Sequence, residues 1–260
     1  MRDKAIRIVT VMVCFLSLLM SGTALAKDKD KDNKEIDAQA EKILRSMCDF
    51  LAAQKGFIVQ EEVYEDEVYP NGQKVQYHKT ATVSLKRPDE LRSDVKGDNA
   101  DRLTVLKGEK LVVLDRETNQ YQEIKVPAGI DATLDFMLEN FNVNVPTSDL
   151  LTSNPFKAVF PNVVAGYDLG EVECDGKTCQ HVAFRQLEVD WQVWIEKGKT
   201  PLPHRIVITD KTLHGNPQYM LIMSKWELSP KFDDKEFDFT PPEGATPGVV
   251  LSDADVTDAN

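Results

Sequence analysis

Residues that usually carry catalysis are scarce and scattered in this chain of 260 residues. The four histidines lie far apart, and there is no Gly-x-Ser-x-Gly, no His-Glu-x-x-His and no glycine-rich phosphate or dinucleotide loop. Basic residues are outnumbered, with 31 Lys and Arg against 43 Asp and Glu. Such a charge balance gives no attraction to nucleic acid or to an anionic lipid surface. The sequence therefore predicts no enzyme, no cofactor, no metal site and no nucleic-acid partner.

Long hydrophobic runs are absent except for one near the N-terminus. Basic residues precede an apolar run at 8–20, and small residues follow at 24–26. This order predicts a secretory signal peptide over residues 1–26, cleaved after Ala26. A retained anchor is the alternative, but the run is shorter than the ~20 residues that cross a bilayer. We expect export to the periplasm and no integral membrane segment after cleavage.

Cysteine is also scarce. Cys174 and Cys179 enclose an Asp-Gly dipeptide that is typical of a hairpin turn. A disulfide between them would stabilise the protein by roughly 2 kcal/mol. A redox pair or half of a metal site are the alternatives, but those sites prefer other spacings and further ligands. Cys48 lies on a helical pattern, where we expect a buried free thiol.

The mature chain is long enough to form one large domain. Residues 27–34 alternate Lys with Asp and predict a charged spacer. A single domain is expected over residues 35–247. Residues 248–260 are small and acidic, and predict a disordered tail.

The periodicity of the chain changes from helical to β-like near residue 56. Apolar residues at helical spacing predict one amphipathic helix within 35–53, with Gly56 as the residue that ends it. Short β-prone segments separated by turn residues then predict an antiparallel meander. They span 57–69, 74–87, 90–96, 102–107, 110–115 and 120–125 and, after a break, 166–174, 179–187, 189–196, 203–210 and 218–228.

The break between residues 130 and 160 has a helical pattern. One helix is expected from Ile130 to Phe141. Thr147 or Ser148 is a candidate cap for a second, and Pro155 is placed to open a third. These short apolar helices suit either a lid over a cavity or a plug that completes a core, and both need the same side chains.

Acidic residues crowd the first strand, at positions 61, 62, 65, 66 and 67. A glycosidase-type pair would need two of them in an apolar cleft. We prefer the interpretation that they form a solubilising edge, which discourages pairing between sheets.

Tryptophan is rare but informative. Trp191 and Trp194 lie on one predicted strand, where alternation sends their side chains to opposite faces. An aromatic face covered by apolar helices could receive an acyl chain. Ordinary core packing explains the same residues equally well.

Several motifs resemble a known bacterial family. They are DWQVWI at 190–195, the Pro-Leu-Pro turn at 201–203, the strand at 205–209, the cysteine hairpin followed by His181, and FDFTPPEGA at 237–245. Over residues 35–248 the chain resembles the domain-of-unknown-function 2092 (DUF2092) family of predicted periplasmic proteins. That family is similar to the LolA/LolB-like superfamily of lipoprotein carriers. The resemblance implies a mainly β fold, in which a strongly curved antiparallel sheet forms an unclosed barrel. An N-terminal helix and short helices would cover its concave face.

These features together predict a non-enzymatic, monomeric periplasmic protein that binds or carries a lipid, a lipoprotein acyl chain or another apolar ligand. The side chains expected to line its cavity are Leu134, Met137, Leu138, Phe141, Leu150, Phe156, Phe160, Val83, Val105, Phe184 and Trp191. An envelope sensor or interaction module with an envelope protein partner is the alternative. A hydrolytic enzyme comes third, and would need His78, His181 or His204 beside an inward-facing acid.

Overall fold

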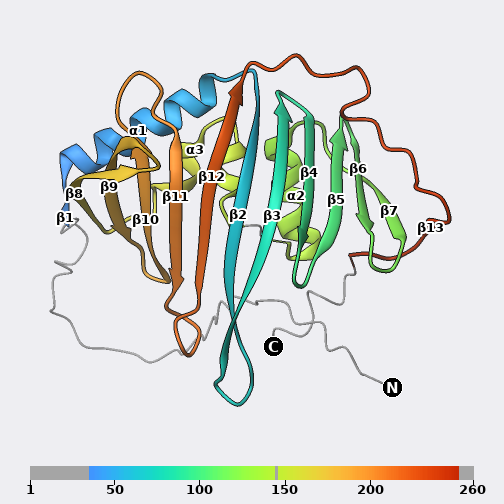
Figure 1. The fold of residues 1–260 in the computed structure, drawn as a ribbon, viewed down its shortest axis with the longest axis horizontal. Helices are drawn as coiled ribbons and strands as arrows, with labels where there is room; N and C mark the ends of the chain where they lie inside the picture. Colours follow the sequence, from blue (N-terminus) through green and yellow to red (C-terminus); the bar gives the residue numbers. More distant parts are fainter. Residues whose placement is uncertain (1–34, 144–145, 252–260) are drawn as a thin grey trace, which may run out of the picture.

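A computed structural model of the chain describes residues 35–143 and 146–251. The predicted signal peptide, the charged spacer and residues 252–260 of the tail lie outside these ranges. One thirteen-stranded sheet carries helices on one face (Figure 1). We call the face of the sheet that carries the helices the covered face, and the opposite face the open face. No helix within the described ranges is long and apolar enough to cross a membrane.

The strands follow one another in the order β1-β8-β9-β10-β11-β12-β2-β3-β4-β5-β6-β7-β13, so the sheet ends in two edges and does not close. The first seven are β1 (Glu35–Ile36), β2 (Gly56–Val68), β3 (Lys74–Lys86), β4 (Glu90–Gly97), β5 (Asp101–Lys107), β6 (Lys110–Asp115) and β7 (Gln120–Lys125). The others are β8 (Ala165–Cys174), β9 (Lys177–Arg185), β10 (Val189–Glu196), β11 (Pro203–Asp210), β12 (Gln218–Leu228) and β13 (Thr246–Pro247). Only the two-residue strands β1 and β13 pair in parallel.

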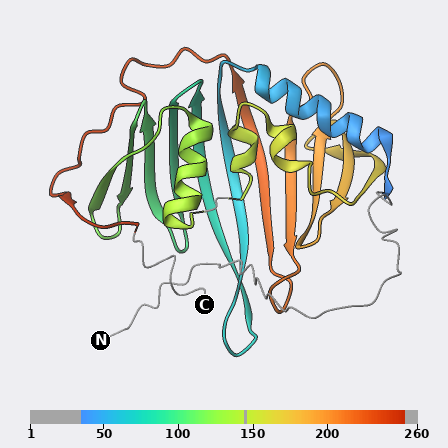
Figure 2. The same cartoon turned by 180° about the vertical axis from the view of Figure 1, so that it is seen from behind.

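Each predicted strand forms within about two residues of its expected bounds, because turn residues separate the strands so regularly. The helices are α1 (Ala38–Ala53), α2 (Ile130–Phe141), the 3₁₀ helix η1 (Ser148–Leu151) and α3 (Pro155–Val159). All of them lie over the same side of the sheet (Figure 2). The predicted fold class, a curved and unclosed antiparallel sheet with helices on one face, is confirmed.

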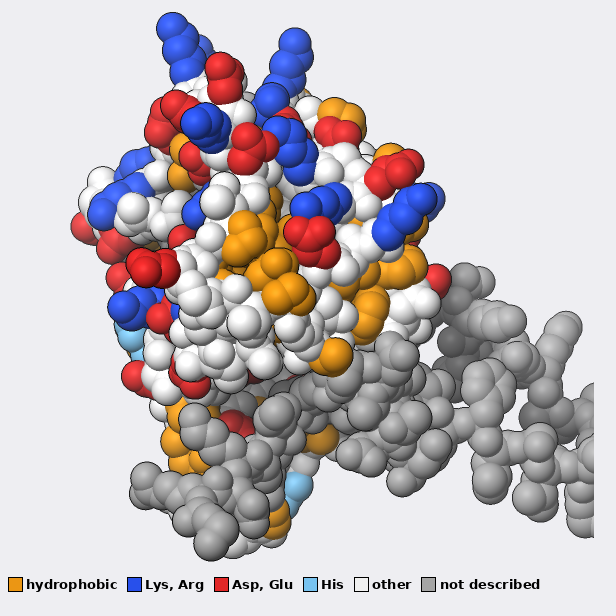
Figure 3. Space-filling view, turned by 90° about the vertical axis from the view of Figure 1, so that its right-hand side faces the viewer, with side chains coloured by type: hydrophobic (Ala, Val, Ile, Leu, Met, Phe, Trp, Pro, Cys, Tyr) orange, Lys and Arg blue, Asp and Glu red, His pale blue; other side chains and the backbone are white. Residues whose placement is uncertain are grey.

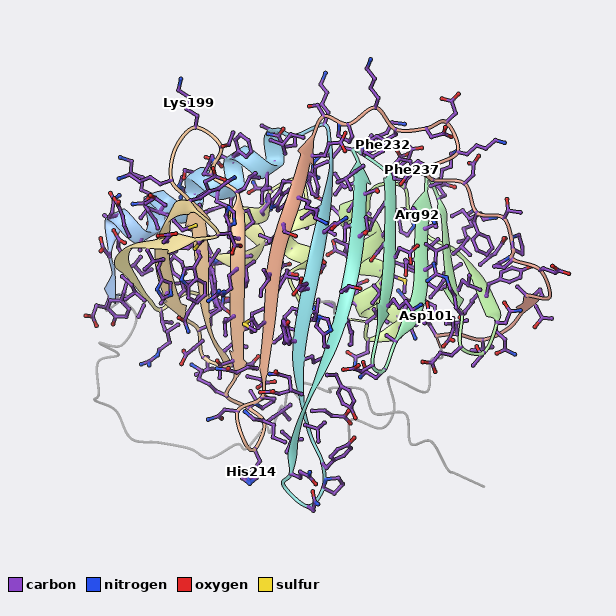
Figure 4. The ribbon with its side chains drawn as sticks, viewed as in Figure 1. Arg92, Asp101, Lys199, His214, Phe232 and Phe237 are labelled. Carbon is purple, nitrogen blue, oxygen red and sulfur yellow. The ribbon has the colours of Figure 1, made fainter. Side chains whose placement is uncertain are left out.

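Helix α1 begins where its sequence provides a cap. The Asp37 side chain accepts a hydrogen bond from the backbone N–H of Gln39 at 2.8 Å. The helix ends before Gly56, which instead begins β2, so the prediction for Gly56 was wrong. A Cβ at Gly56 would lie 2.8 Å from the Leu85 carbonyl oxygen and 2.9 Å from the ring of Phe232. This glycine serves close packing at the end of the sheet where Figure 4 labels Phe232.

The mid-chain helices form as predicted, with one difference in capping. Pro155 opens α3, and the Asn154 side chain accepts a hydrogen bond from the Lys157 N–H at 3.0 Å. Thr147 precedes η1 with a positive φ of 74°, and its side chain makes no capping hydrogen bond. Ser148 is the first residue of η1 itself. Neither predicted residue therefore caps this helix through its side chain.

The acidic strand β2 lies in the middle of the sheet, between β12 and β3. The predicted solubilising edge was therefore wrong. Asp66 is buried, pairs with Lys74 at 2.9 Å and accepts a hydrogen bond from the Gln218 N–H at 3.0 Å. Burial acts to raise the pKa of Asp66, but these partners and Gln76 together lower it. This acid stabilises the junction of three strands instead of repelling a neighbour.

The C-terminal segment crosses the end of the sheet and returns along β7 (Figure 1). A small second cluster on the open face joins Leu103, Val105 and Leu114, with Phe239 packed against it. The backbone N–H of Leu251 donates to the Gln122 side chain at 2.8 Å, and Leu251 is 8% exposed. Residues 248–251 therefore contact the sheet, and the rest of the predicted tail lies outside the described residues.

Candidate functional site

Aromatic rings join the helices to the sheet on the covered face. Phe156 of α3 and Phe160, the residue that follows this helix, stack with ring centroids 4.5 Å apart, and Phe160 meets Phe184 of β9 edge-on at 6.4 Å. Phe184 stacks on Trp191 of β10 at 4.4 Å. Such pairs contribute about 0.5–1.5 kcal/mol each beyond their buried area. Four residues that were predicted to line one surface therefore lie together.

Most of the other predicted lining residues belong to the same apolar cluster. Val83, Met137 and Leu150 are buried in it, while Leu134 and Phe141 pack against it and stay half-buried. The predicted set thus marks the inner side of the helices and the covered face of the sheet.

Two predicted lining residues lie elsewhere. Leu138 is 47% exposed, because it follows the buried Met137 by one position and points away from the sheet. Val105 belongs to the second cluster on the open face. Its neighbour Leu106 faces the helices instead. Strand β5 is apolar on both sides, so its sequence did not reveal which side meets the helices.

Glu61 is a feature of the covered face that the sequence analysis missed. It alternates along β2 with Val59 and Val63, which are 1% and 6% exposed, and it therefore faces the helices. Its cross-strand neighbours are Met223 on β12 and Ala81 on β3, both buried. The sequence does contain a signal for Glu61: it is an acid at a position of β2 where the alternation of apolar and polar residues predicts an apolar side chain.

The Glu61 carboxyl has no partner that compensates its charge. Burial raises the pKa of Glu61 to about 7. Among the residues the structure describes, none donates a hydrogen bond to it. Lys79, two residues before Ala81 on the neighbouring strand β3, is paired with Glu65 at 2.6 Å. The Tyr219 hydroxyl stays protonated, since burial and the nearby Glu61 and Glu65 raise its pKa.

Hydrogen bonds fasten the helical segment to the sheet at several points, and Gln186, just after β9, donates to the Val159 carbonyl of α3 at 2.9 Å. Arg87, just after β3, donates to the backbone carbonyls of Leu151 at 2.7 Å and Gln54 at 3.2 Å. Asp131 of α2 accepts hydrogen bonds from the N–H and hydroxyl of Ser153 at 2.9 Å and 2.5 Å. Helix α1 lies close on β8, β9 and β10, whereas α2 approaches η1 more closely than it approaches any strand.

The histidines do not assemble a catalytic group with Glu61. His181 stacks on Trp194 at 4.0 Å and bonds Gln192, which confirms that Trp194 faces away from Trp191. His204 lies 3.3 Å from Glu196, the arrangement that an enzyme would need.

Glu196, however, is also held by Lys177 at 2.7 Å. Burial acts to raise the pKa of Glu196, but Lys177 and His204 together lower it. A carboxylate stabilised in this way is a poor general base at neutral pH. Within the described residues, no group of three or more His, Cys, Asp and Glu side chains could hold a metal ion.

The cysteines within the described residues, Cys48, Cys174 and Cys179, are free thiols. The turn between Cys174 and Cys179 forms as predicted, with positive φ at Asp175 and Gly176. The two sulfur atoms are not joined, so the predicted disulfide is not confirmed. Burial and a hydrogen bond with Cys174 raise the pKa of Cys179 to about 12. Cys48 is buried in the main cluster, as predicted.

A groove of about 600 Å³ lies on the open face near the centre of the sheet. Polar side chains of β2, β3 and β4 line it, together with Glu236. Several of these already pair with each other, as Ser84 does with Glu236 at 3.0 Å and Arg92 with Asp94 at 3.7 Å. Arg92 is labelled in Figure 4. The groove is lined mainly by polar and charged residues, so we prefer the covered face as the candidate site for an apolar ligand.

Comparison with known families gives one extensive match. The model of a family described as predicted periplasmic protein (DUF2092) matches residues 40–248. This range contains the whole sheet except β1, and all four helices apart from the first two residues of α1. The resemblance stated from the tryptophan, proline and cysteine motifs is confirmed.

Three solved structures are similar at low sequence identity. An uncharacterized conserved protein from Thermus thermophilus is 13% identical, with 81% of this chain and 98% of that chain covered and a TM-score of 0.48. A LolA superfamily protein from Nitrosomonas europaea is 14% identical, with coverages of 76% and 96% and a TM-score of 0.38. The lipoprotein LppX from Mycobacterium tuberculosis is 12% identical, with coverages of 75% and 98% and a TM-score of 0.44. No curated protein matches the chain, so its function must be argued from its own residues.

Proposed function

The chain belongs to the DUF2092 family of predicted periplasmic proteins, and from this premise we propose that it binds a lipid, an acyl chain or another apolar ligand without catalysing a reaction. The ligand would lie between the covered face of the sheet and the helices α2, η1 and α3. The protein would act as a carrier or a binding protein of the cell envelope.

One observation carries this proposal. Large apolar side chains pack against the main cluster yet stay half-buried, among them Phe136 and Phe141 of α2, Phe156 of α3, and Trp191 and Ile208 of the sheet. Large apolar side chains that gather on one face and keep part of their surface exposed are typical of a binding surface. Covering them with a ligand removes their remaining apolar surface from water.

The energy available is sufficient for an uncharged chain. Burial contributes about 25 cal/mol per Å² of apolar surface, or roughly 0.8 kcal/mol for each CH₂ group. About ten methylene groups would therefore supply roughly 8 kcal/mol before the entropic cost of binding is subtracted.

A tryptophan pair gives the direct test. Trp191 lies on the covered face, and Trp194 lies on the open face beside His181. Titration with a fluorescent apolar probe such as 1-N-phenylnaphthylamine should quench or shift the emission of Trp191. Trp191→Phe should lose most of this response and keep only the part due to Trp226, which also packs against the main cluster. The control Trp194→Phe should keep the full response. Failure of the probe to bind, or a response that depends on Trp194, would contradict the proposal.

Export and disulfide formation belong to the same proposal. We infer that residues 1–26 are cleaved after Ala26 during export. In an oxidising compartment Cys174 and Cys179, whose thiols are already close enough to share a hydrogen bond, would then form a disulfide. N-terminal sequencing and thiol counting on protein taken from the periplasm test both points. An intact N-terminus, or three free thiols in the mature protein, would contradict them.

A second candidate function rests on the edge strand β8. Beyond Gly166, β8 pairs with no described residue on its outer side. It also exposes Tyr167, Leu169 and Val172 by 43%, 52% and 37%. Such an edge suits an extended segment of a protein partner. A photocrosslinker at position 169 should capture one envelope protein in cells if this edge binds a partner, and none if it does not.

The opposite end of the sheet is also partly apolar. Figure 3 shows hydrophobic side chains gathered in the middle of the end that carries β7 and β13. Val249 there is 72% exposed. A crosslinker at position 249 is the comparison for the one at β8, and an equal yield at both ends would indicate nonspecific adhesion.

A further inference from the structure

The covered face combines an apolar surface with one acid that has no partner. Glu61 is the third of four consecutive covered-face positions on β2, after Phe57 and Val59 and before Val63. The other three are buried and apolar. A glutamine or leucine would satisfy the alternation of this strand at lower cost, because an unpaired carboxylate loses hydration there.

The charges around Glu61 do not compensate it. On its own strand, Glu65 is paired with Lys79 of β3 at 2.6 Å. On β12, Tyr219 faces Glu61 and Glu65 and is kept neutral by burial and by their charges. Asp149 of η1 adds another acid, though it is solvent-exposed. The acids of α2 toward its C-terminal end, Asp135 and Glu139, are likewise exposed to solvent.

The group formed by Glu61, Glu65 and Lys79 therefore carries one net negative charge when Glu61 is ionised. A ligand with a carboxylate head would add a second negative charge in an apolar setting. A ligand with an alcohol head would leave the charge uncompensated. A cationic head would neutralise it and restore the hydrogen bonds that the Glu61 carboxylate lacks.

We propose that the covered face binds an amphiphile with a long apolar chain and a cationic amine head, and that the amine pairs with Glu61. This inference rests on the proposed function, since it specifies the ligand class of the same surface. In this proposal Glu61 selects the head group of the ligand, and the apolar cluster binds its hydrocarbon chain.

The first experiment compares three ligands that share one chain length. Dodecylamine, dodecanol and dodecanoate, each below its micelle concentration, would compete against 1-N-phenylnaphthylamine at pH 8. On the unmodified protein we expect dodecylamine to bind about tenfold more tightly than dodecanol or better, the range of one charged hydrogen bond. Dodecanoate should bind most weakly.

The second experiment removes the acid while preserving its shape. Glu61→Gln should bind dodecylamine and dodecanol about equally. The matched control is Glu62→Gln, which changes the next residue of the same strand on the open face. This control should keep the full preference for the amine. A preference that survives in Glu61→Gln, or that disappears in Glu62→Gln, would overturn the proposal.

The pH dependence provides an independent readout. Glu61 titrates near pH 7 in the free protein, whereas the amine is charged throughout the range from pH 5 to 8. The affinity for dodecylamine should rise with pH through about 7 and then level off, while that for dodecanol should not rise. Flat curves for both ligands would overturn the proposal.

Failure of this inference differs from failure of the proposed function. If the neutral probe binds but the three dodecyl ligands compete equally, the apolar site stands and the role of Glu61 is refuted. If the probe does not bind at all, while circular dichroism shows a folded protein, both proposals are refuted.

Discussion

Replacing Glu61 by glutamine should stabilise the protein, and the gain should depend on pH. At pH 8 the unmodified protein must keep an ionised carboxylate among Val59, Val63 and Met223. Glutamine fills the same space without a charge. A residue whose loss stabilises the fold is maintained for another reason, and the proposed ligand supplies one.

The magnitude follows from the pKa of Glu61, which burial raises from 4.5 to about 7. Each pKa unit corresponds to about 1.4 kcal/mol, so the full penalty is about 3 kcal/mol, or about 2 kcal/mol after discounting for partial access to solvent. Below pH 4.5 the group is protonated in both folded and unfolded chains and makes no difference. Between 4.5 and 7 only the folded protein keeps the proton, so the stability of the unmodified protein falls as pH rises. Above 7 the penalty is complete.

Urea unfolding followed by tryptophan fluorescence at pH 4.5, 6, 7 and 8 measures this effect. The difference in unfolding free energy between Glu61→Gln and the unmodified protein should be near zero at pH 4.5 and grow to about 2 kcal/mol at pH 8. Glu62→Gln should follow the unmodified protein at every pH. Parallel curves for Glu61→Gln and the unmodified protein would refute the reasoning.

Three further predictions concern the framework of the site. Arg87→Ala should lower the free energy of unfolding, measured in urea, by about 2–4 kcal/mol, because two backbone carbonyls lose a charged donor. An effect below about 0.5 kcal/mol would show that these bonds do not hold the helices. Cys48 should react with a thiol reagent only after unfolding, since burial raises the pKa of its thiol to about 12. In the Cys174→Ser/Cys179→Ser variant Cys48 is the thiol left in the mature protein, and rapid reaction of this variant while folded would contradict the prediction. Gly56→Ala should destabilise the protein by about 1–3 kcal/mol, because the added Cβ meets the Leu85 carbonyl oxygen at 2.8 Å. A melting temperature equal to that of the unmodified protein would show that β2 and β3 move apart enough to accept the Cβ.

Much of the fold could be read from local patterns. The alternation of apolar and polar residues, with turn residues such as those at 71–72 and 175–176, located the strands within about two residues. Helical spacing located α1 and α2, and Pro155 marked the start of α3. Motifs around Trp191 and the cysteine hairpin indicated the family. These signals are local, since each depends on residues close together in the chain.

Part of the candidate site could be predicted for the same reason. Large apolar residues of the mid-chain helices had to face the sheet, and Phe156, Phe160, Phe184 and Trp191 do meet there. Strand β5 shows the limit of this reasoning. Apolar residues on both of its sides concealed that Val105 belongs to the open face.

The order of strands was decided by tertiary structure alone. Strand β2 looked like an acidic edge, but it pairs with β12, which follows it by about 150 residues in the chain. That long-range pairing places Glu61 between Met223 and Ala81 and under the helices. A carboxylate is ordinary on a solvated edge and unusual on a covered strand, because only the second environment removes its water. The amino-acid sequence by itself determined which segments become strands and helices, and the pairing of distant strands determined which of their charges became partly shielded from solvent.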